Sequence, residues 1–290
     1  MDAFSIVAIA IMIATLALGM LKRFSLTLML LIGNLVVFLI EILGPGFTVE
    51  VELGFRPVYL QTGQGLYTIF TSMFVHAGLY HIFANMLFLF LFGWPLEERI
   101  GKYKVLIIYL VAGVLGLMLQ SMVMWGSSAI IIGASGAISG LVGALFILYP
   151  RDKLTLPLFI IILPNVPVWA ATMAFFASQL PYVLGFGASG VAYAAHLGGF
   201  LAGMALASLL GKAQKAKKSI KYKDEGLEPL ATTPELRSAL EKIKGERQPD
   251  IRKAWLEYFA ARAKCPKCGS SFHYKGDKLV SDCGYEVRLR

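Results

Sequence analysis

The chain has 290 residues, of which 57% are hydrophobic and only 16% are charged, and its formal net charge is +9. A soluble protein of this size carries about 25% charged residues, so the composition excludes an ordinary soluble domain and indicates a membrane protein. The excess basic residues lie in short stretches beside apolar runs, which is typical of cytoplasmic loops and argues against nucleic-acid binding.

Two apolar runs open the chain. Residues 3–21 are long enough to span a bilayer. No basic residue precedes them and no small-residue cleavage site is evident, so we do not interpret them as a signal peptide. The short turn at Lys22 and Arg23 leaves an interfacial position as the alternative, but we favour a true span. The second run extends from Phe24 to about Leu43.

Residues 44–75 are too polar and too interrupted to span, so we expect a partly helical interfacial loop. The remainder of the apolar body predicts five more spans. One covers residues 79–96, and two lie within the 46 uncharged positions from Val105 to Pro150, with a break near residues 125–128. The last two lie within the 58 uncharged positions from Leu154 to Gly211, divided at Pro181 and residues 185–187.

The basic residues predict the orientation of these seven spans. They fall on one face of the membrane, which the positive-inside rule makes cytoplasmic: Lys22, Arg23, Arg99, Lys102, Lys104, Arg151, Lys153 and the cluster from Lys212 to Lys223. The amino terminus and the 44–75 loop are then outside. We therefore expect a multi-pass protein of the cell membrane, with a cytoplasmic C-terminal domain and a site that opens toward the extracytoplasmic side.

A serine and a histidine in two of these spans form a candidate catalytic pair. Ser135 lies near the outer end of its predicted span, and His196 about two turns into another, so their depths are compatible. A serine hydroxyl is a poor nucleophile until a base accepts its proton, and His196 is the candidate base. Since the outward loops between the later spans contain no acid, we predict a dyad without a third carboxylate member.

Two more polar residues lie four positions apart and share one helix face, His81 and Asn85. Imidazole N–H and amide N–H groups are donors that an oxyanion requires; an ordinary helix–helix hydrogen bond is the alternative. His76 has the wrong spacing for that face, and we expect it to brace the outer loop. Small residues repeat along both candidate spans and predict close helix packing: Gly136, Gly140 and Gly143 in one, and Ala195, Gly199, Gly203 and Ala207 in the other.

Three segments together resemble the rhomboid intramembrane serine proteases, over about residues 24–211: Gly133-Ala134-Ser135-Gly136, His76-x4-His81-x3-Asn85 and Ala195-His196-Leu197-Gly198-Gly199. The resemblance implies that Ser135 is the nucleophile, that His196 is the general base, and that His81, Asn85 and the Ser135 backbone N–H hold the oxyanion. It implies membrane-protein substrates, cut in or near a transmembrane segment that unwinds easily, and no cofactor for catalysis. The Glu97 and Arg99 positions also match a family motif, which we interpret as structural.

Two departures from the family pattern concern supporting residues. Some members place Tyr one turn after the nucleophile, under the histidine ring, whereas this chain has Ser139 there. Many carry Trp-Arg in the outer loop, where this chain has Phe55-Arg56. Neither change removes a reactive group. The expected fold class is an all-α polytopic membrane protein with a rhomboid-like six-helix core and one extra N-terminal helix.

The C-terminal part contains all three cysteines, Cys265, Cys268 and Cys283. The Cys-x-x-Cys spacing points to metal or to a reduced compartment, and the segment resembles a zinc ribbon. A usual ribbon has a second Cys-x-x-Cys, but position 280 is Val, so His273 or Asp282 would have to complete four ligands. A degenerate site is the alternative. Upstream, Thr233 followed by Pro234 predicts a helix start, and a second short helix begins at Asp250.

The predicted organisation is residues 1–23 as an extra transmembrane helix, 24–211 as the catalytic core, 212–232 as a basic linker, 233–264 as short helices and 265–290 as the Cys-rich knuckle. The leading hypothesis for function is an intramembrane serine endopeptidase. A non-catalytic rhomboid-like protein that binds transmembrane helices is the main alternative. A small-solute transporter would show internal repeats, and no motif repeats in this chain.

Overall fold

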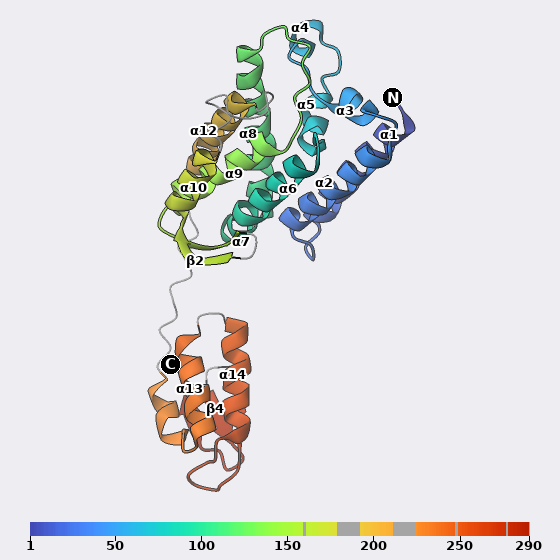
Figure 1. The fold of residues 1–290 in the computed structure, drawn as a ribbon. Helices are drawn as coiled ribbons and strands as arrows, with labels where there is room; N and C mark the ends of the chain where they lie inside the picture. Colours follow the sequence, from blue (N-terminus) through green and yellow to red (C-terminus); the bar gives the residue numbers. More distant parts are fainter. Residues whose placement is uncertain (159–160, 179–191, 211–223, 247–248, 277, 290) are drawn as a thin grey trace. The chain divides into compact units, whose positions relative to one another are not determined.

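The structure is a computed structural model that describes residues 1–158, 161–178, 192–210, 224–246, 249–276 and 278–289. The chain divides into two compact units, Met1–Gln214 and Lys215–Arg290 (Figure 1). The basic cluster from Lys212 to Lys223, predicted to anchor the topology, lies outside the described residues.

The first unit is built mainly of helices. They are α1 (Ala3–Met20), α2 (Leu26–Leu43), α3 (Thr48–Leu53), α4 (Tyr59–Thr62), α5 (Thr68–Thr71), η1 (Ser72–Phe74), α6 (Leu79–Phe88), η2 (Leu89–Gly93), α7 (Trp94–Ile100), α8 (Lys102–Val123), α9 (Ser135–Leu148), α10 (Val168–Ala177) and α12 (Tyr193–Leu210). The π-helical turn η2 joins α6 to α7, so residues 79–100 form one continuous helical stretch.

Within the described part of the chain, five helical stretches are at least 18 residues long and apolar enough to cross a membrane. They are α1, α2, the 79–100 stretch, α8 and α12. Helices α9 and α10 are also apolar but shorter, with 14 and 10 residues. This arrangement is that of a polytopic helical membrane protein, and it confirms the predicted helical character of these runs.

The N-terminal helix α1 packs along α2 at one edge of the first unit (Figure 1). The buried residues of α1 are Ser5, Ala8, Met12, Thr15 and Gly19, of which Thr15 and Gly19 lie directly against α2. Both ends of α1 are held by charged side chains from elsewhere. The Glu52 carboxylate accepts from the Asp2 backbone N–H at 2.9 Å, and Lys102 donates to the carbonyl oxygens of Gly19, Leu21 and Phe24. Charges of these signs stabilise the corresponding helix ends, so α1 is an integral part of this unit.

Glu97 and Arg99 hold helix ends together on one side of the bundle. The Glu97 carboxylate accepts from the backbone N–H groups of Leu26 and Thr27, at 2.8 and 2.7 Å, and thereby caps the first turn of α2. Arg99 Nε donates to Asp152 Oδ2 at 2.9 Å. These contacts are structural, as we expected for this pair of residues.

The 44–75 loop contains short helices, which confirms its predicted partly helical character. Phe55 is fully buried, and its backbone exchanges two hydrogen bonds with Ile131, at 3.0 and 2.7 Å. Arg56 donates to the carbonyl oxygen of Ser128. The Phe55-Arg56 pair therefore joins this loop to the segment that leads into α9.

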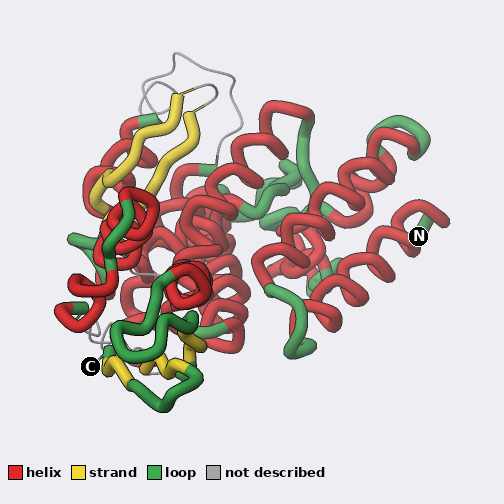
Figure 2. The backbone as a smooth tube through the Cα atoms, turned by 90° about the horizontal axis from the view of Figure 1, so that it is seen from below, coloured by secondary structure: helices red, strands yellow, loops and turns green. Residues whose placement is uncertain are grey.

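The prediction of one helical span in the uncharged run after Lys153 is wrong. Strands β1 (Lys153–Leu158) and β2 (Ile161–Pro167) form an antiparallel hairpin, shown in yellow in Figure 2, and the 10-residue helix α10 follows it directly. Pro157, Pro164 and Pro167 each lack a backbone N–H and disrupt a helix interior. The predicted break at Pro181 and residues 185–187 lies outside the described residues.

The second unit combines η3 (Glu225–Leu230), α13 (Pro234–Gly245) and α14 (Pro249–Arg262) with a three-stranded antiparallel sheet. The strands, β3 (Phe272–Tyr274), β4 (Lys278–Ser281) and β5 (Glu286–Arg288), pair in sequence order. Thr233 Oγ1 accepts from the Leu236 N–H at 3.3 Å, which confirms Thr233 as the N-cap. The chain as a whole is therefore mostly, not wholly, helical.

The predicted linker 212–232 extends too far. Leu227 and Leu230 are buried in the core of the second unit, beside Phe259 and Leu279. Asp224 forms a buried ion pair with Arg252. The reason is that two leucines three residues apart on a short helix bury apolar area, so the folded unit begins before α13.

Candidate active site

Ser135 is the first residue of α9, directly after a tight turn. Gly133 has a φ of +117°, a conformation that favours glycine. A Cβ built at Gly133 would also lie 2.6 Å from His81 Nε2. The Gly133 N–H donates to the Ser72 carbonyl oxygen at 2.8 Å. The turn therefore needs glycine at this position, and it places Ser135 at the N-terminus of a helix, where backbone N–H groups have no intrahelical acceptor.

His196 lies in the first turn of α12, buried beside α9. Its Nε2 atom is 2.7 Å from Ser135 Oγ, which is a hydrogen-bond distance across 61 residues of sequence. The Tyr193 ring contacts the His196 ring edge-on, with 6.3 Å between the centroids. Where some rhomboids place tyrosine, Ser139 instead donates to the Ser135 carbonyl oxygen at 2.8 Å. Among the described residues, Tyr193 therefore gives His196 a ring contact from the same helix.

The glycines of α9 and α12 let the two backbones meet. A Cβ at Gly199 would overlap the carbonyl oxygen of Gly136, and a Cβ at Gly203 would overlap that of Gly140. Helix α8 packs against the same face of α12, where a Cβ at Gly116 would overlap the Ala195 carbonyl oxygen. Because no side chain separates the α9 and α12 backbones at these glycines, Ser135 and His196 come within hydrogen-bond distance.

His81 and Asn85 lie on α6, with their side chains on one face. The Ala77 N–H donates to His81 Nδ1 at 3.3 Å. Because Nδ1 accepts this bond, the proton of the neutral ring lies on Nε2, the atom that borders Gly133. Asn85 Nδ2 donates to the His81 carbonyl oxygen at 2.9 Å. An amide has two N–H donors, so Asn85 retains one beyond this bond.

His76 lies outside α6, in the turn that follows η1. Its Nδ1 is 3.2 Å from the Phe74 carbonyl oxygen, and its backbone N–H points at the Glu41 carboxylate. The His76 and His81 rings contact each other edge-on, 5.0 Å apart. Sequence spacing places His76 off the helix face of His81. The two rings nevertheless meet because the turn folds back onto the helix.

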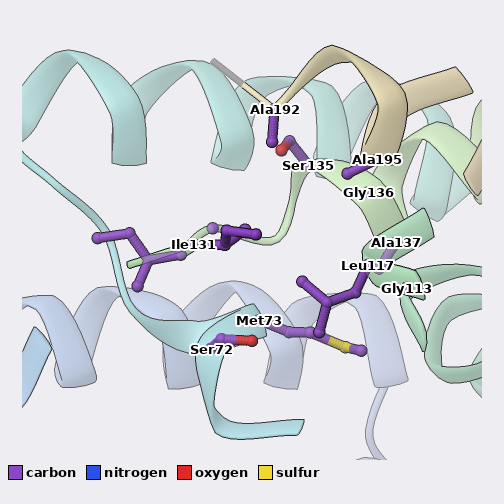
Figure 3. Close-up of a pocket in the computed structure, with 12 residues that line it drawn as sticks. Ser72, Met73, Gly113, Leu117, Ile131, Ser135, Gly136, Ala137, Ala192 and Ala195 are labelled. Atoms are coloured by element: carbon purple, nitrogen blue, oxygen red, sulfur yellow. The ribbon is translucent and has the colours of Figure 1, made fainter. Parts of the chain in front are cut away.

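A small cavity lies beside Ser135, with a volume of about 20 Å³. That is room for about one water molecule. Ser135 and Ala192 line one end of it, and Ser72 and Met73 lie across from them (Figure 3). Leu117, Ile131 and Gly113 complete an apolar wall. Met73 and Leu117 were not among the residues predicted for the site, because an apolar residue in a largely apolar sequence carries no distinguishing signal.

Three cysteine sulfurs converge in the second unit. The Sγ atoms of Cys265, Cys268 and Cys283 all lie within 4.8 Å of one another, and those of Cys265 and Cys283 are 3.7 Å apart. A tetrahedron with Zn–S bonds of about 2.3 Å has edges of about 3.8 Å. Hydrogen bonding from Ser270 lowers the pKa of the Cys268 thiol to about 6, which favours the thiolate that binds metal. Three of the four ligands that structural zinc takes are therefore present at suitable separations.

The two residues proposed to complete that set do not join it. His273 and Asp282 are exposed and lie 3.4 Å from each other, between Nε2 and Oδ1. Neither belongs to the metal-competent group found in the described part of the chain. Val280, which stands where a ribbon would carry its fourth cysteine, pairs with His273 across β3 and β4. This part of the chain therefore offers three sulfur ligands.

The fold and the hydrogen-bonded serine–histidine pair define a polytopic helical membrane protein with two polar side chains joined inside its bundle. The family model of the rhomboid domain matches residues 63–213, more than half of the chain. The chain therefore belongs to the rhomboid family.

Curated relatives come from plants, parasites and bacteria. RHOMBOID-like protein 1 of Arabidopsis thaliana is 31% identical over 167 residues, 57% of this chain and 40% of that protein. Rhomboid-like protease 3 of Toxoplasma gondii is 32% identical over 150 residues, 51% of this chain and 52% of that protein. Rhomboid protease GlpG of Haemophilus influenzae is 28% identical over 148 residues, 51% of this chain and 71% of that protein. The matches with the first two cover about half of each relative's length.

Proposed function

We propose that this protein is an intramembrane serine endopeptidase that uses Ser135 and His196 as a catalytic dyad. The observation that carries the proposal is the 2.7 Å separation of Ser135 Oγ and His196 Nε2 inside the helical bundle. A base at this distance can accept the serine proton as the hydroxyl attacks a carbonyl carbon. Two relatives whose names call them proteases support the same class of activity.

In the proposed reaction, Ser135 Oγ attacks the scissile carbonyl carbon while His196 Nε2 takes its proton. The tetrahedral intermediate then collapses, the C–N bond breaks, and His196 gives the proton to the leaving amine. Water attacks the resulting ester with His196 again as base, and this step releases the second product and restores Ser135. No cofactor enters these steps.

The proposed oxyanion donors are His81 Nε2–H, an N–H of Asn85 and the Ser135 backbone N–H. The bond from the Ala77 N–H to His81 Nδ1 supports His81 as a donor, because it leaves the ring proton on Nε2. The position of Ser135 at the start of α9 supports the backbone donor, since the positive end of a helix dipole favours a developing negative charge.

Substrates in this proposal are transmembrane proteins cut in or near a membrane span that unwinds easily. The cavity beside Ser135 is small and mainly apolar, which favours a small side chain next to the cleaved bond. The basic residues beside the spans support an orientation with the site toward the extracytoplasmic side of the cell membrane and the second unit in the cytoplasm.

Cleavage of a model transmembrane substrate by the purified full chain tests this function. A serine-directed phosphonate should also label the protein at Ser135, as located by mass spectrometry, and His196→Ala should abolish the labelling. Binding of the substrate without any cleavage or labelling would favour the non-catalytic helix-binding alternative. Cleavage that is the same with Ser135→Ala would reject the dyad.

Loss of either side-chain oxyanion donor should slow catalysis strongly. We expect His81→Ala and Asn85→Ala each to lower kcat by about 10²–10³-fold with little change in KM, because these bonds strengthen as charge develops. The control is Leu79→Ala, an exposed position on the same helix. A rise in KM of the same size, with kcat unchanged, would instead assign His81 and Asn85 to substrate binding.

We also propose that Cys265, Cys268 and Cys283 hold a structural zinc ion in the second unit. Zinc would join the turn after α14 to the β4–β5 connection. Elemental analysis of the full chain should find about one zinc per molecule, and Cys→Ser at any of the three positions should reduce it. His273→Ala and Asp282→Ala should retain the metal. Zinc loss in either of these two variants would contradict the three-sulfur set, and a zinc-free wild type would reject the site.

A further inference from the structure

An acidic side chain lies buried near the end of α2, and the proposed reaction does not use it. Glu41 is 4% exposed, and both of its carboxylate oxygens lie 3.3 Å from the backbone nitrogen of His76. Ionisable residues inside apolar helices are costly and usually have a defined partner. Here the partner is the backbone of the turn that precedes α6.

The 72–77 turn, which comprises η1 and the three residues after it, contacts both halves of the candidate site. At one end, the Ser72 carbonyl oxygen accepts from the Gly133 N–H at 2.8 Å, two residues before Ser135. At the other end, the Ala77 N–H donates to His81 Nδ1 at 3.3 Å. His76, whose N–H points at Glu41, is the residue directly before Ala77, so Glu41 holds the 72–77 turn beside its bond to His81.

The orientation of the His81 ring depends on the position of the 72–77 turn, because the His76 ring contacts it. His76 is almost fully buried, and its Nδ1 bond to Phe74 fixes its ring within the turn. The ring then contacts the His81 ring edge-on at 5.0 Å. A shift of the turn would move this ring contact and the Ala77 N–H together. The orientation and tautomer of His81 both depend on them.

We infer that Glu41 is a positioning residue: it anchors the 72–77 turn, which keeps His81 in the Nε2–H tautomer facing Gly133 and the start of α9. The inference rests on the proposed function insofar as His81 is an oxyanion donor. Glu41 touches no reacting atom in this role and acts only through the turn. Loss of Glu41 would leave the buried His76 N–H without this acceptor, which is destabilising. The alternative to be excluded is therefore that Glu41 only stabilises the fold.

Two substitutions separate these roles. Glu41→Gln keeps an acceptor oxygen for the His76 N–H, and kcat should stay within about twofold. Glu41→Leu removes the acceptor, and we expect kcat to fall about tenfold with KM unchanged, since a donor displaced by a fraction of an ångström already costs rate. In a His81→Ala background the same leucine substitution should cost nothing further.

A matched control lies on the same helix. Asn34 is fully buried in α2, and its amide donates within that helix to the Leu30 carbonyl oxygen at 2.8 Å. Asn34→Leu should lower thermal stability without a selective loss of kcat. If Glu41→Leu does not fold, Glu41→Asp replaces it, because the carboxylate is then one methylene short of the turn and a smaller kcat loss is expected.

Nitrogen-15 NMR of labelled histidine in the full chain gives a readout that needs no activity. His81 should show a protonated Nε2 and an unprotonated Nδ1 in wild type and Glu41→Gln, and a mixture of tautomers in Glu41→Leu. If wild type cleaves nothing, the proposed function fails while the tautomer shift still tests the positioning. Wild-type kcat together with an unchanged His81 tautomer in Glu41→Leu would overturn the inference.

Discussion

Ser135→Ala should lower the rate of substrate cleavage by about 10⁴-fold or more, because the reaction loses the atom that forms the acyl-enzyme. His196→Ala should have a similar effect, since a serine hydroxyl without a base is a poor nucleophile. The double variant should be no slower than either single one, because two residues that act as a unit do not contribute additively. The measurement is kcat on a model transmembrane substrate in one detergent or lipid preparation.

Ser139→Ala is the matched control for this prediction. It removes a buried hydroxyl one turn after Ser135, and this hydroxyl donates to the Ser135 carbonyl oxygen. Loss of one such bond is worth about 1 kcal/mol, so kcat should fall by no more than about fivefold. An equal loss in Ser139→Ala and Ser135→Ala would show that disturbance of α9, rather than removal of a nucleophile, explains both results.

Gly203→Ala should be strongly destabilising although alanine is the better helix former. The new Cβ would overlap the carbonyl oxygen, carbonyl carbon and Cα of Gly140, and backbone atoms in a packed helix cannot move aside as a flexible side chain does. Overpacking of this kind costs about 1–3 kcal/mol or more, against a helix-propensity gain of about 1 kcal/mol. We expect a lower thermal midpoint and loss of activity, measured on the same preparation.

Gly136→Ala is the informative comparison for stability. It lies at the same α9–α12 crossing, but its Cβ would meet only ordinary contacts, the nearest being the Ala195 carbonyl oxygen at 3.6 Å. The propensity gain should therefore leave the thermal midpoint unchanged or raise it. If both glycines tolerate alanine, the two helices do not pack as closely as the structure has them.

The comparison of these two glycines illustrates what a sequence pattern can predict. The repeats in residues 136–143 and 195–207 predicted that two spans would approach each other closely, and α9 and α12 do so. The pattern treated all its glycines alike. Which of them needs to be glycine depends on the angle and register of the crossing, and these are properties of the packed pair.

The uncharged run after Lys153 shows a different limit. Hydropathy and length predicted a span there, whereas the chain forms a hairpin and a 10-residue helix. The prolines at 157, 164 and 167 argue against a helix, but the prediction relied on the length and lack of charge of the run. A long apolar run reports that a segment avoids water, and it does not report which hydrogen-bonded form the backbone takes.

The sequence by itself determined the membrane character of this protein, most of its helical runs and the short set of polar residues within them. The reason is that charged residues and histidines are rare in membrane spans, so each one within an apolar run is easily recognised. Tertiary structure decided which of those residues meet. Ser135 meets His196, His76 meets His81, and Glu41 meets the backbone of His76. These contacts join residues 5 to 61 positions apart. Only the packing of the helices sets such distances, since local periodicity relates residues of one helix and carries no information on the register between two.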